Sequence, residues 1–379
     1  MILEKIQIWG LLIILLLGTS CNNHKTETHI NKEEIYTPEY SQNFKIEGLE
    51  NSKNILITVF NPWQGSKDVS TQLLIIKDSI VPDDFHGQVL MDKAKKIVCM
   101  SSTHIAMLDV LDALNSVVGV SGLEYVSNPK INASSTLTPD VGYEGNIDYE
   151  TLISINPDLV LLFSVNGAST MEPKLQELKI PYLYIGDYLE EEPLGKSEWI
   201  IPIAEVIGER EKGIEIFNTI VDKYENLKVK VKIAEEERPK IMVNAPFVDS
   251  WFMPSTQSYV ARMINDAGGE YIYKKNTGNS SKPIDMEEAL LLVSQSDYWI
   301  NIGSVRSLEE FKNSFPNFLE ADCVVKGNLY NNNLRSSIEG GNDCYESGVV
   351  NPDLILKDMI KIFHPSLIDE EFTYYQKLE

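Results

Sequence analysis

The feature that most constrains the fold is one long helical segment between two stretches in which short strands and helices alternate. Residues 209–236 place apolar side chains three or four positions apart, as on one face of an α-helix. These residues are Ile214, Phe217, Ile220, Val221, Tyr224, Leu227 and Val231. At 1.5 Å per residue the helix would reach about 40 Å, and Pro239 ends it. A shorter helix before it stops near Ile207, where Gly208 interrupts the pattern.

Strand and helix alternate on both sides of this segment. Before it we expect strands at 97–100, 117–120, 159–163 and 182–185, with helices at 103–114, 149–155 and near 173–178. After it we expect strands at 241–244 and 298–302, with helices at 259–267, 286–293 and 352–364. Such alternation forms parallel sheets covered by helices on both faces. The predicted fold class is α/β, with two Rossmann-like lobes, parallel central sheets, one long rigid joining helix and a ligand cleft between the lobes.

The same patterns give the domain boundaries. We place an N-terminal lobe at 46–195, linking helices at 196–238 and a C-terminal lobe at 239–379. Residues 55–80 are β-like with a turn at Asn61-Pro62, so the first lobe opens with an added hairpin in which Trp63 is assigned to packing. A faint repeat supports two similar lobes, because an acidic helix start precedes a core strand in each. The two starts are Asp148-Tyr149-Glu150 and Asp285-Met286-Glu287-Glu288.

The amino terminus has the pattern of an export signal. Ile6 through Leu17 are mostly apolar and follow Lys5, but the run is shorter than the roughly 20 residues that cross a bilayer. It therefore predicts a signal peptide over residues 1–20. Gly18-Thr19-Ser20-Cys21 resembles a bacterial lipoprotein signal, in which the cysteine takes a lipid and becomes the first mature residue. A plain signal peptide followed by an incidental cysteine is the alternative.

A lipidated Cys21 predicts a protein anchored to a membrane in the periplasm, on a leaflet that the sequence leaves open. Polar residues 21–45 are then expected to form a tether, because they hold too few apolar side chains to pack. The remaining cysteines are Cys99, Cys323 and Cys344. An exported setting would permit a Cys323–Cys344 disulfide, and buried free cysteines are the alternative.

Charge and metal-ligand composition exclude several classes of function. The chain has 33 Lys and Arg against 56 Asp and Glu, a formal net charge of −23, which argues against nucleic-acid partners. It has five His and four Cys, few for a bare transition-metal site that needs three or four such ligands. We therefore expect no resident metal and no cofactor.

Several segments in order resemble one protein family. They are Ile97-Val98-Cys99-Met100-Ser101-Ser102-Thr103-His104, the stretch from Glu150 to Leu162, the long helix, Gly268-Gly269, and Glu346-Ser347-Gly348-Val349-Val350-Asn351-Pro352-Asp353. Over about residues 90–365 the chain resembles the class III substrate-binding proteins of ABC importers, which deliver iron–siderophore complexes, haem or cobalamin. The resemblance implies a monomer with two rigid lobes, a shallow cleft, a metal-chelate ligand and an ABC permease dimer as partner.

In that family one glutamate on each lobe meets arginines of the permease. The resemblance carries this role to Glu150 and Glu288, with Glu287 left open as the alternative on the second lobe. Charge-assisted Arg–carboxylate pairs are directional enough to set such a register. The competing interpretation is local, because acidic residues after the caps Asp148 and Asp285 also stabilise a helix start.

Ligand contacts are expected in loops after the carboxyl ends of the strands. The candidates are Ser102, His104, Tyr125, Trp251, Phe252, Arg306, Tyr330 and Arg335. The aromatic rings would offer flat faces to a macrocycle or a catecholate, and the arginines would pair with an anionic iron complex. The alternatives are loop packing for the aromatics and surface ion pairs for the arginines. His104 could ligate a haem iron or be a core or capping histidine.

The sequence has no Gly-x-Ser-x-Gly elbow, phosphate loop or Gly-x-Gly-x-x-Gly turn, so no enzyme is predicted. The predicted function is a substrate-binding lipoprotein that captures a metal chelate and delivers it to a membrane permease, with a slight preference for an anionic iron complex. Two alternatives stay open. One is a lipid-anchored scavenging lipoprotein that passes ligand to another receptor, and the other is a chelatase-like enzyme, on fold analogy alone.

Overall fold

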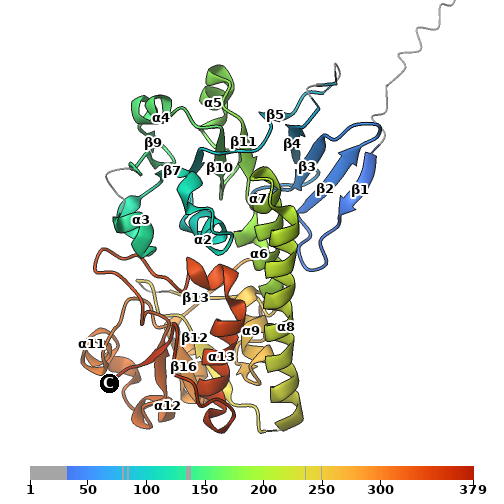
Figure 1. Ribbon diagram of the computed structural model, residues 1–379. Helices are drawn as coiled ribbons and strands as arrows, with labels where there is room; N and C mark the ends of the chain where they lie inside the picture. The colour runs from blue at the N-terminus through green and yellow to red at the C-terminus, as the bar shows by residue number, and fades with distance from the viewer. Residues whose placement is uncertain (1–31, 79–80, 83–84, 134–137, 235, 249) are drawn as a thin grey trace, which may run out of the picture. The chain divides into compact units, whose positions relative to one another are not determined.

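The computed structural model describes residues 32–78, 81–82, 85–133, 138–234, 236–248 and 250–379. From Lys32 onward these residues belong to one compact unit with three sheets of four or five strands (Figure 1). The predicted signal peptide, Cys21 and the first part of the predicted tether lie outside the described residues. Within the described ranges, no helix is long and apolar enough to cross a membrane.

The N-terminal lobe contains a parallel sheet of order β11-β10-β6-β7. Its strands are β6 (Ile97–Cys99), β7 (Val117–Val120), β10 (Leu159–Leu162) and β11 (Tyr182–Tyr184), and its helices include α2 (Ser102–Val110), α3 (Pro129–Ala133), α4 (Tyr149–Ile155) and α5 (Glu172–Leu178). Nearly every strand residue is buried, as in a sheet covered on both faces. Helix α2 stops before the predicted Leu114, because Asp112 takes a left-handed conformation with φ of 55°.

The C-terminal lobe repeats this plan with the sheet order β14-β12-β16-β17-β18. Strands β12 (Lys240–Val243), β14 (Glu270–Tyr271), β16 (Tyr298–Ile300) and β17 (Leu329–Asn331) are parallel, and β18 (Gln376–Lys377) is an antiparallel edge. The helices are α9 (Tyr259–Asp266), α10 (Met286–Ser294), α11 (Leu308–Ser314), α12 (Asp322–Val325) and α13 (Pro352–Phe363), and β13 (Trp251–Met253) pairs separately with β15 (Lys282–Ile284). The predicted fold of two lobes with parallel central sheets is confirmed.

Three helices join the lobes: α6 (Pro193–Glu198), α7 (Ile200–Val206) and α8 (Arg210–Ala234). The predicted long helix is α8, with 25 residues, and it runs alongside both lobes in Figure 1. It buries one face through Gly213, Phe217, Ile220 and Tyr224. Gly208, with φ of 77°, separates α7 from α8 as the sequence indicated.

The region before the first lobe is a sheet of five strands, larger than the hairpin predicted there. Its strands are β1 (Lys32–Tyr36), β2 (Phe44–Leu49), β3 (Ile55–Phe60), β4 (Ser70–Ile76) and β5 (Gln88–Met91). β1 to β4 pair antiparallel, and β4 and β5 pair parallel. We call these five strands and their connecting turns the N-terminal sheet.

The predicted tether over 21–45 is therefore corrected for residues 32–45, which are folded into this sheet. The physical reason is one buried carboxylate. Glu198 accepts hydrogen bonds from the Tyr36 hydroxyl at 2.6 Å and from the backbone N–H groups of Glu39, Tyr40 and Ser41 at 2.8, 2.9 and 2.6 Å. The segment is held by polar contacts from α6, so its low apolar content misled the prediction.

The three described cysteines, Cys99, Cys323 and Cys344, are buried and free. The possible Cys323–Cys344 disulfide is thus not formed, and the alternative of buried free thiols is the one observed. Burial raises the pKa of all three thiols, so they are poor nucleophiles at neutral pH.

Candidate functional site

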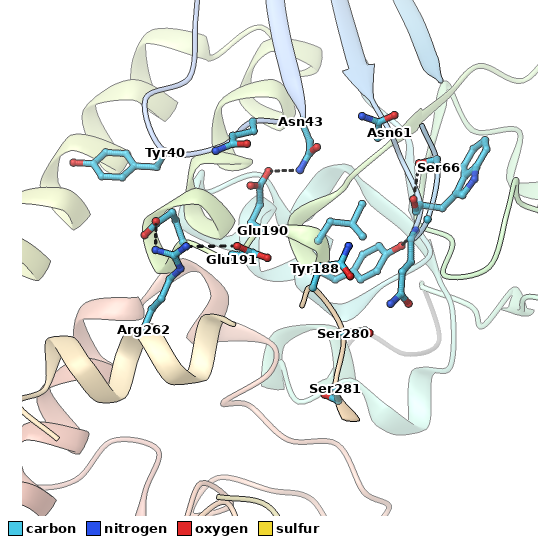
Figure 2. A pocket seen from close by; sticks show the side chains of 17 residues that line it. Tyr40, Asn43, Asn61, Ser66, Tyr188, Glu190, Glu191, Arg262, Ser280 and Ser281 are labelled. Carbon is cyan, nitrogen blue, oxygen red and sulfur yellow. Dashed lines mark hydrogen bonds and ion pairs between the residues drawn. The ribbon is translucent and has the colours of Figure 1, made fainter. Parts of the chain in front are cut away.

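A cavity of about 560 Å³ is lined by residues of both lobes and of the N-terminal sheet (Figure 2). This volume lies in the usual range of small-molecule sites, about 300–1,000 Å³. The lining residues are Tyr40, Gln42, Asn43, Asn61, Trp63, Gln64, Gly65 and Ser66 from the N-terminal sheet, Tyr188, Leu189, Glu190, Glu191 and Glu192 from the segment after β11, and Arg262, Asn279, Ser280 and Ser281 from the C-terminal lobe. We call it the lobe-spanning cavity.

The middle wall follows the carboxyl end of β11, where open α/β sheets place their ligands. Tyr188 fixes this wall. Its hydroxyl donates to the backbone oxygen of Ser164 at 2.5 Å and accepts from the backbone N–H of Gln64 at 3.2 Å. Its ring also packs edge-on against Phe163, with centroids 6.4 Å apart. One tyrosine thereby connects the ends of β10 and β11 to the N-terminal sheet.

The outer wall is the turn between β3 and β4. Asn61 and Gly65 have φ values of 46° and 78°, and nothing lies within 4 Å of a Cβ built on Gly65. The Ser66 hydroxyl donates to the Trp63 backbone oxygen at 2.6 Å. The Trp63 ring packs edge-on against Tyr184 at 5.7 Å. Trp63 thus packs against a strand of the first lobe, not within the predicted hairpin, and it also lines the cavity, which the sequence did not reveal.

A buried carboxylate supports the floor of the cavity. Glu190 accepts from the Ser41 hydroxyl at 2.5 Å, from Asn43 Nδ2 at 3.1 Å and from Trp199 Nε1 at 3.0 Å. Burial raises its pKa, and the same three hydrogen bonds oppose the shift. Glu190 therefore orients Asn43, as Figure 2 shows, and links the N-terminal sheet to the linking helices.

An ion pair crosses the cavity from lobe to lobe. Arg262, on α9, places Nη1 2.6 Å from Glu192 and Nη2 3.5 Å from Glu191. Its Nε donates to the Gln257 backbone oxygen at 2.9 Å, and Nη2 also donates to the Gln257 amide oxygen at 3.1 Å. All three guanidinium nitrogens have protein partners, so the only arginine of the lining is already neutralised.

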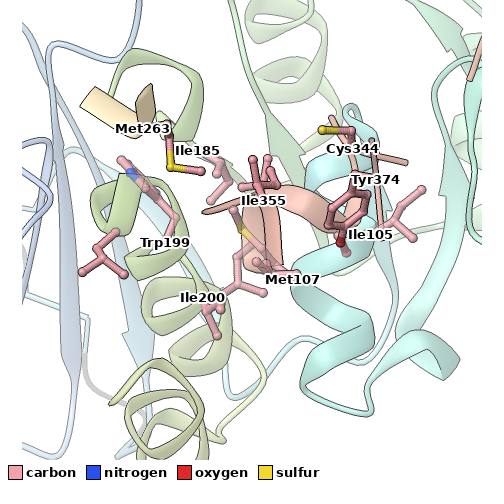
Figure 3. Close-up of a cluster of buried hydrophobic side chains, with 14 of the residues drawn as sticks. Ile105, Met107, Ile185, Trp199, Ile200, Met263, Cys344, Ile355 and Tyr374 are labelled. Atoms are coloured by element: carbon pink, nitrogen blue, oxygen red, sulfur yellow. The ribbon is translucent and has the colours of Figure 1, made fainter. Parts of the chain in front are cut away.

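The lobes also meet through an apolar cluster, which we call the interlobe core (Figure 3). The labelled members are Ile105 and Met107 from α2, Ile185 after β11, Trp199 and Ile200 from the linking helices, and Met263, Cys344, Ile355 and Tyr374 from the C-terminal lobe. All are buried. In addition, the Ser197 hydroxyl donates to the backbone oxygen of Val349 at 2.8 Å. Two lobes with a shared core and a joining helix resist large relative motion.

Comparison with known proteins agrees with this geometry. Residues 97–327 match the family model described as periplasmic binding protein. The chain belongs to the periplasmic binding protein family. The predicted family is confirmed.

The relatives of this periplasmic binding protein include the uncharacterized lipoprotein MJ0878 of Methanocaldococcus jannaschii, 26% identical over 364 residues, with 89% of this chain and 84% of the relative covered. A solved periplasmic heme-binding protein from Pseudomonas aeruginosa matches 76% of this chain and 98% of its own, with a TM-score of 0.59 and 13% identity. The periplasmic heme-binding protein RhuT from Roseiflexus sp. RS-1 matches 72% and 99%, with a TM-score of 0.57 and 17% identity. At these identities the structural likeness shows the fold.

None of the ligand contacts predicted for this periplasmic binding protein lines the lobe-spanning cavity. The predictions for Trp251 and His104 are wrong, because a side chain without exposed surface cannot touch a ligand. Trp251 is fully buried and donates to the Val243 backbone oxygen at 2.9 Å. Alternation along β13 turns Trp251 inward and leaves Phe252 45% exposed.

His104 is the second correction. It is fully buried in α2, beside the backbone of Leu161. Burial lowers its pKa to about 3, so the ring is neutral. The structure places it as a core histidine, the alternative to a haem ligand.

The other predicted contacts have protein neighbours or lie elsewhere. Tyr330 packs in the sheet between Tyr298 and Phe372, with ring centroids 6.3 and 6.0 Å away. Arg306 Nη2 donates to the Ser337 backbone oxygen at 2.7 Å, and Arg335 lies 2.9 Å from Asp343. None of these neighbours tests a ligand contact, so Tyr330, Arg306 and Arg335 remain predictions. Tyr125, which is 53% exposed, half-buried Ser102 and Phe252 also remain predictions.

The two predicted docking helices start alike. Asp148 Oδ1 accepts from the Thr151 N–H at 3.0 Å, and Asp285 Oδ1 accepts from the Glu288 N–H at 2.8 Å, so both predicted N-caps are confirmed. Glu150 is exposed, and the described residues provide it with no ion pair. Glu288 is only part-exposed and pairs with Lys275 at 2.5 Å.

The signals for the lobe-spanning cavity were weak in the sequence. The Asn61-Pro62-Trp63 turn marked an insertion beside a binding fold, and an aromatic at its tip was a usable hint. Nothing local marked Arg262 or Asn279 as neighbours of Glu191 and Tyr188, because they come together only through the packing of both lobes.

Proposed function

We propose that this protein is the substrate-binding lipoprotein of an ABC importer, capturing a metal chelate (iron–siderophore, haem or cobalamin) and delivering it to the permease. The observation that carries the proposal is the lobe-spanning cavity in a member of the periplasmic binding protein family. The lipoprotein name of the relative MJ0878 supports a membrane-anchored, periplasmic location.

Rigid capture is expected, because α8 and the interlobe core join the lobes. A pre-formed site loses little conformational freedom on binding. The direct test is titration of the full-length protein, purified in detergent, with haem, cobalamin and ferric siderophores, followed by tryptophan fluorescence. We expect saturable binding of one class at one site, with a smaller quench in Trp63→Phe. Absence of binding by every chelate would contradict the proposal.

For permease docking we propose Glu150 on the first lobe and Glu287, in place of Glu288, on the second. Both follow an aspartate N-cap by two positions, whereas Glu288 corresponds to Thr151. Glu287 is exposed, and Glu288 already has Lys275 as its partner. A two-fold permease offers two equivalent basic sites, so equivalent helix positions are the ones that fit both.

The docking proposal is tested by uptake of a labelled ligand in the native host. Glu150→Gln and Glu287→Gln are each expected to lower uptake about tenfold, the scale of one lost charged hydrogen bond, while ligand affinity is unchanged. Glu288→Gln is the matched control, one position away on the same helix, and is expected to retain uptake. If Glu288→Gln lowers uptake and Glu287→Gln does not, Glu288 is the docking residue of the second lobe. Unchanged uptake in all three would favour the scavenging lipoprotein.

A further inference from the structure

We propose that the lobe-spanning cavity selects an uncharged or cationic chelate rich in hydrogen-bonding groups and rejects polyanionic chelates. The inference rests on the proposed function and narrows its ligand. It reverses the slight sequence-based preference for an anionic iron complex, which depended on Arg306 and Arg335. Both of those arginines have protein partners and lie outside the cavity lining.

The first argument is the charge of the lining. It holds three consecutive carboxylates, Glu190, Glu191 and Glu192, and one arginine. Arg262 is engaged by Glu192 at 2.6 Å, by Glu191 at 3.5 Å and by Gln257. An anionic ligand entering this cavity would have to displace a carboxylate from that guanidinium or lie unpaired beside Glu191 and Glu192. Either choice costs binding energy, because juxtaposed like charges are strongly unfavourable in a partly desolvated site.

Lys196, next to the cavity in the linking helices, also has a partner in the protein. Lys196 stands over the Tyr259 ring, with its ammonium 5.0 Å from the centroid. Burial lowers its pKa, while the charges of Asp187 and Glu190 oppose that shift. Burial raises the pKa of both acids. Both cations are therefore engaged by the protein, Arg262 by two carboxylates and Lys196 by the Tyr259 ring.

The third argument is unused hydrogen-bonding capacity. In the described ranges, the side chains of Gln64, Asn279 and Ser281 line the cavity and have no hydrogen-bond partner in the protein. Amides and hydroxyls suit the neutral oxygen and nitrogen groups of a hydroxamate or an amide-bearing macrocycle. The Trp63 ring, which lines the same cavity, is also the best aromatic face for a cation.

The two solved structures described above are named as heme-binding proteins. Haem carries two carboxylates. Their likeness to this chain shows the fold, whereas the charge of the cavity is a property of its own residues. Glu191, Glu192 and Arg262 therefore predict a different ligand class on a shared scaffold.

The test compares four probes on the full-length protein: ferrioxamine B (a cationic ferric hydroxamate), cyanocobalamin (no net charge), haem, and ferric enterobactin (a polyanionic catecholate). We expect ferrioxamine B or cyanocobalamin to bind at least about tenfold more tightly than haem and ferric enterobactin. Tight binding of haem or ferric enterobactin would overturn the inference and leave the proposed function standing. Failure of all four probes and of further siderophores would remove the proposed function itself.

A charge variant locates the selection. Glu192→Gln frees part of Arg262, so the ratio of cationic to anionic affinity is expected to fall about tenfold. Glu309→Gln, an exposed acid on α11 outside the cavity, is the matched control and should keep the ratio. If the preferred probe binds Trp63→Ala and Glu192→Gln as tightly as the unaltered protein, the ligand occupies another place and the assignment to this cavity is overturned.

Discussion

The two lobes meet through contacts of opposite chemistry, the interlobe core and the lobe-spanning cavity. In the interlobe core, the side chains of Met107, Trp199 and Ile355 are almost completely buried. In the cavity, the lobes touch through Arg262 and Glu192, whose side chains are 30% and 44% exposed. Buried apolar groups contribute several kcal/mol each, whereas a part-exposed ion pair contributes about 0–1 kcal/mol. Because its stabilising free energy is larger, the interlobe core is expected to hold the lobes together. The polar contact contributes little stability, and its role is expected in ligand preference.

The largest effect is expected from an interlobe-core truncation. Ile355→Ala removes a buried side chain of α13 that fills the space beside Gly348. We expect the free energy of unfolding to fall by about 3 kcal/mol, as for other buried isoleucines. Chemical denaturation followed by circular dichroism measures it. The matched control is Ile233→Ala on α8, which is 75% exposed and should change stability by less than about 0.5 kcal/mol. Equal effects at both positions would break the comparison.

Another contact between the lobes sharpens the comparison, because it is formed by a carboxyl group and yet is buried. Glu346 accepts a hydrogen bond from the Ser127 N–H at 2.6 Å. Burial raises its pKa to about 7, and the Ser127 N–H opposes the shift, while nearby Asp343 and Asp109 add to it. The stability of the contact between Glu346 and Ser127 therefore depends on whether the Glu346 carboxyl group is protonated.

The sign of the pH effect follows from that raised pKa. The folded state holds the proton more tightly than the unfolded state, so the stabilisation is complete below the usual pKa of 4.5 and is lost as pH rises through about 7. We expect stability to fall by up to about 3 kcal/mol across this window, at 1.36 kcal/mol per pKa unit. Denaturation at several pH values should show a flatter profile for Glu346→Gln than for Glu309→Gln. If the two variants lose stability equally as pH rises, Glu346 is not the cause of the pH dependence.

The sequence predicted those parts of the molecule that local periodicity determines. Helix α8, the caps Asp148 and Asp285 and the start of α13 at Pro352 follow from neighbouring residues. Contacts between distant residues were missed. Glu198 holds a segment about 160 positions earlier, and no local pattern encodes such a pairing. Trp251 and Phe252 were both predicted as ligand contacts in a loop, but they lie in β13, where alternation buries Trp251 and exposes Phe252.

The smallest effect on stability is expected at the polar contact itself. Arg262→Gln breaks the ion pair with Glu192 and Glu191, and we expect the free energy of unfolding to change by less than about 1 kcal/mol, because these side chains are part-exposed. The same change leaves two carboxylates unpaired in the cavity, so affinity for a cationic chelate should rise several-fold in a fluorescence titration. Lys326→Gln, which breaks the exposed pair with Asp322 on α12, is the matched control for stability and should leave ligand affinity unchanged. A loss of stability as large as that of Ile355→Ala would mean that Arg262 holds the lobes together, and the division between cohesion and selection would fail.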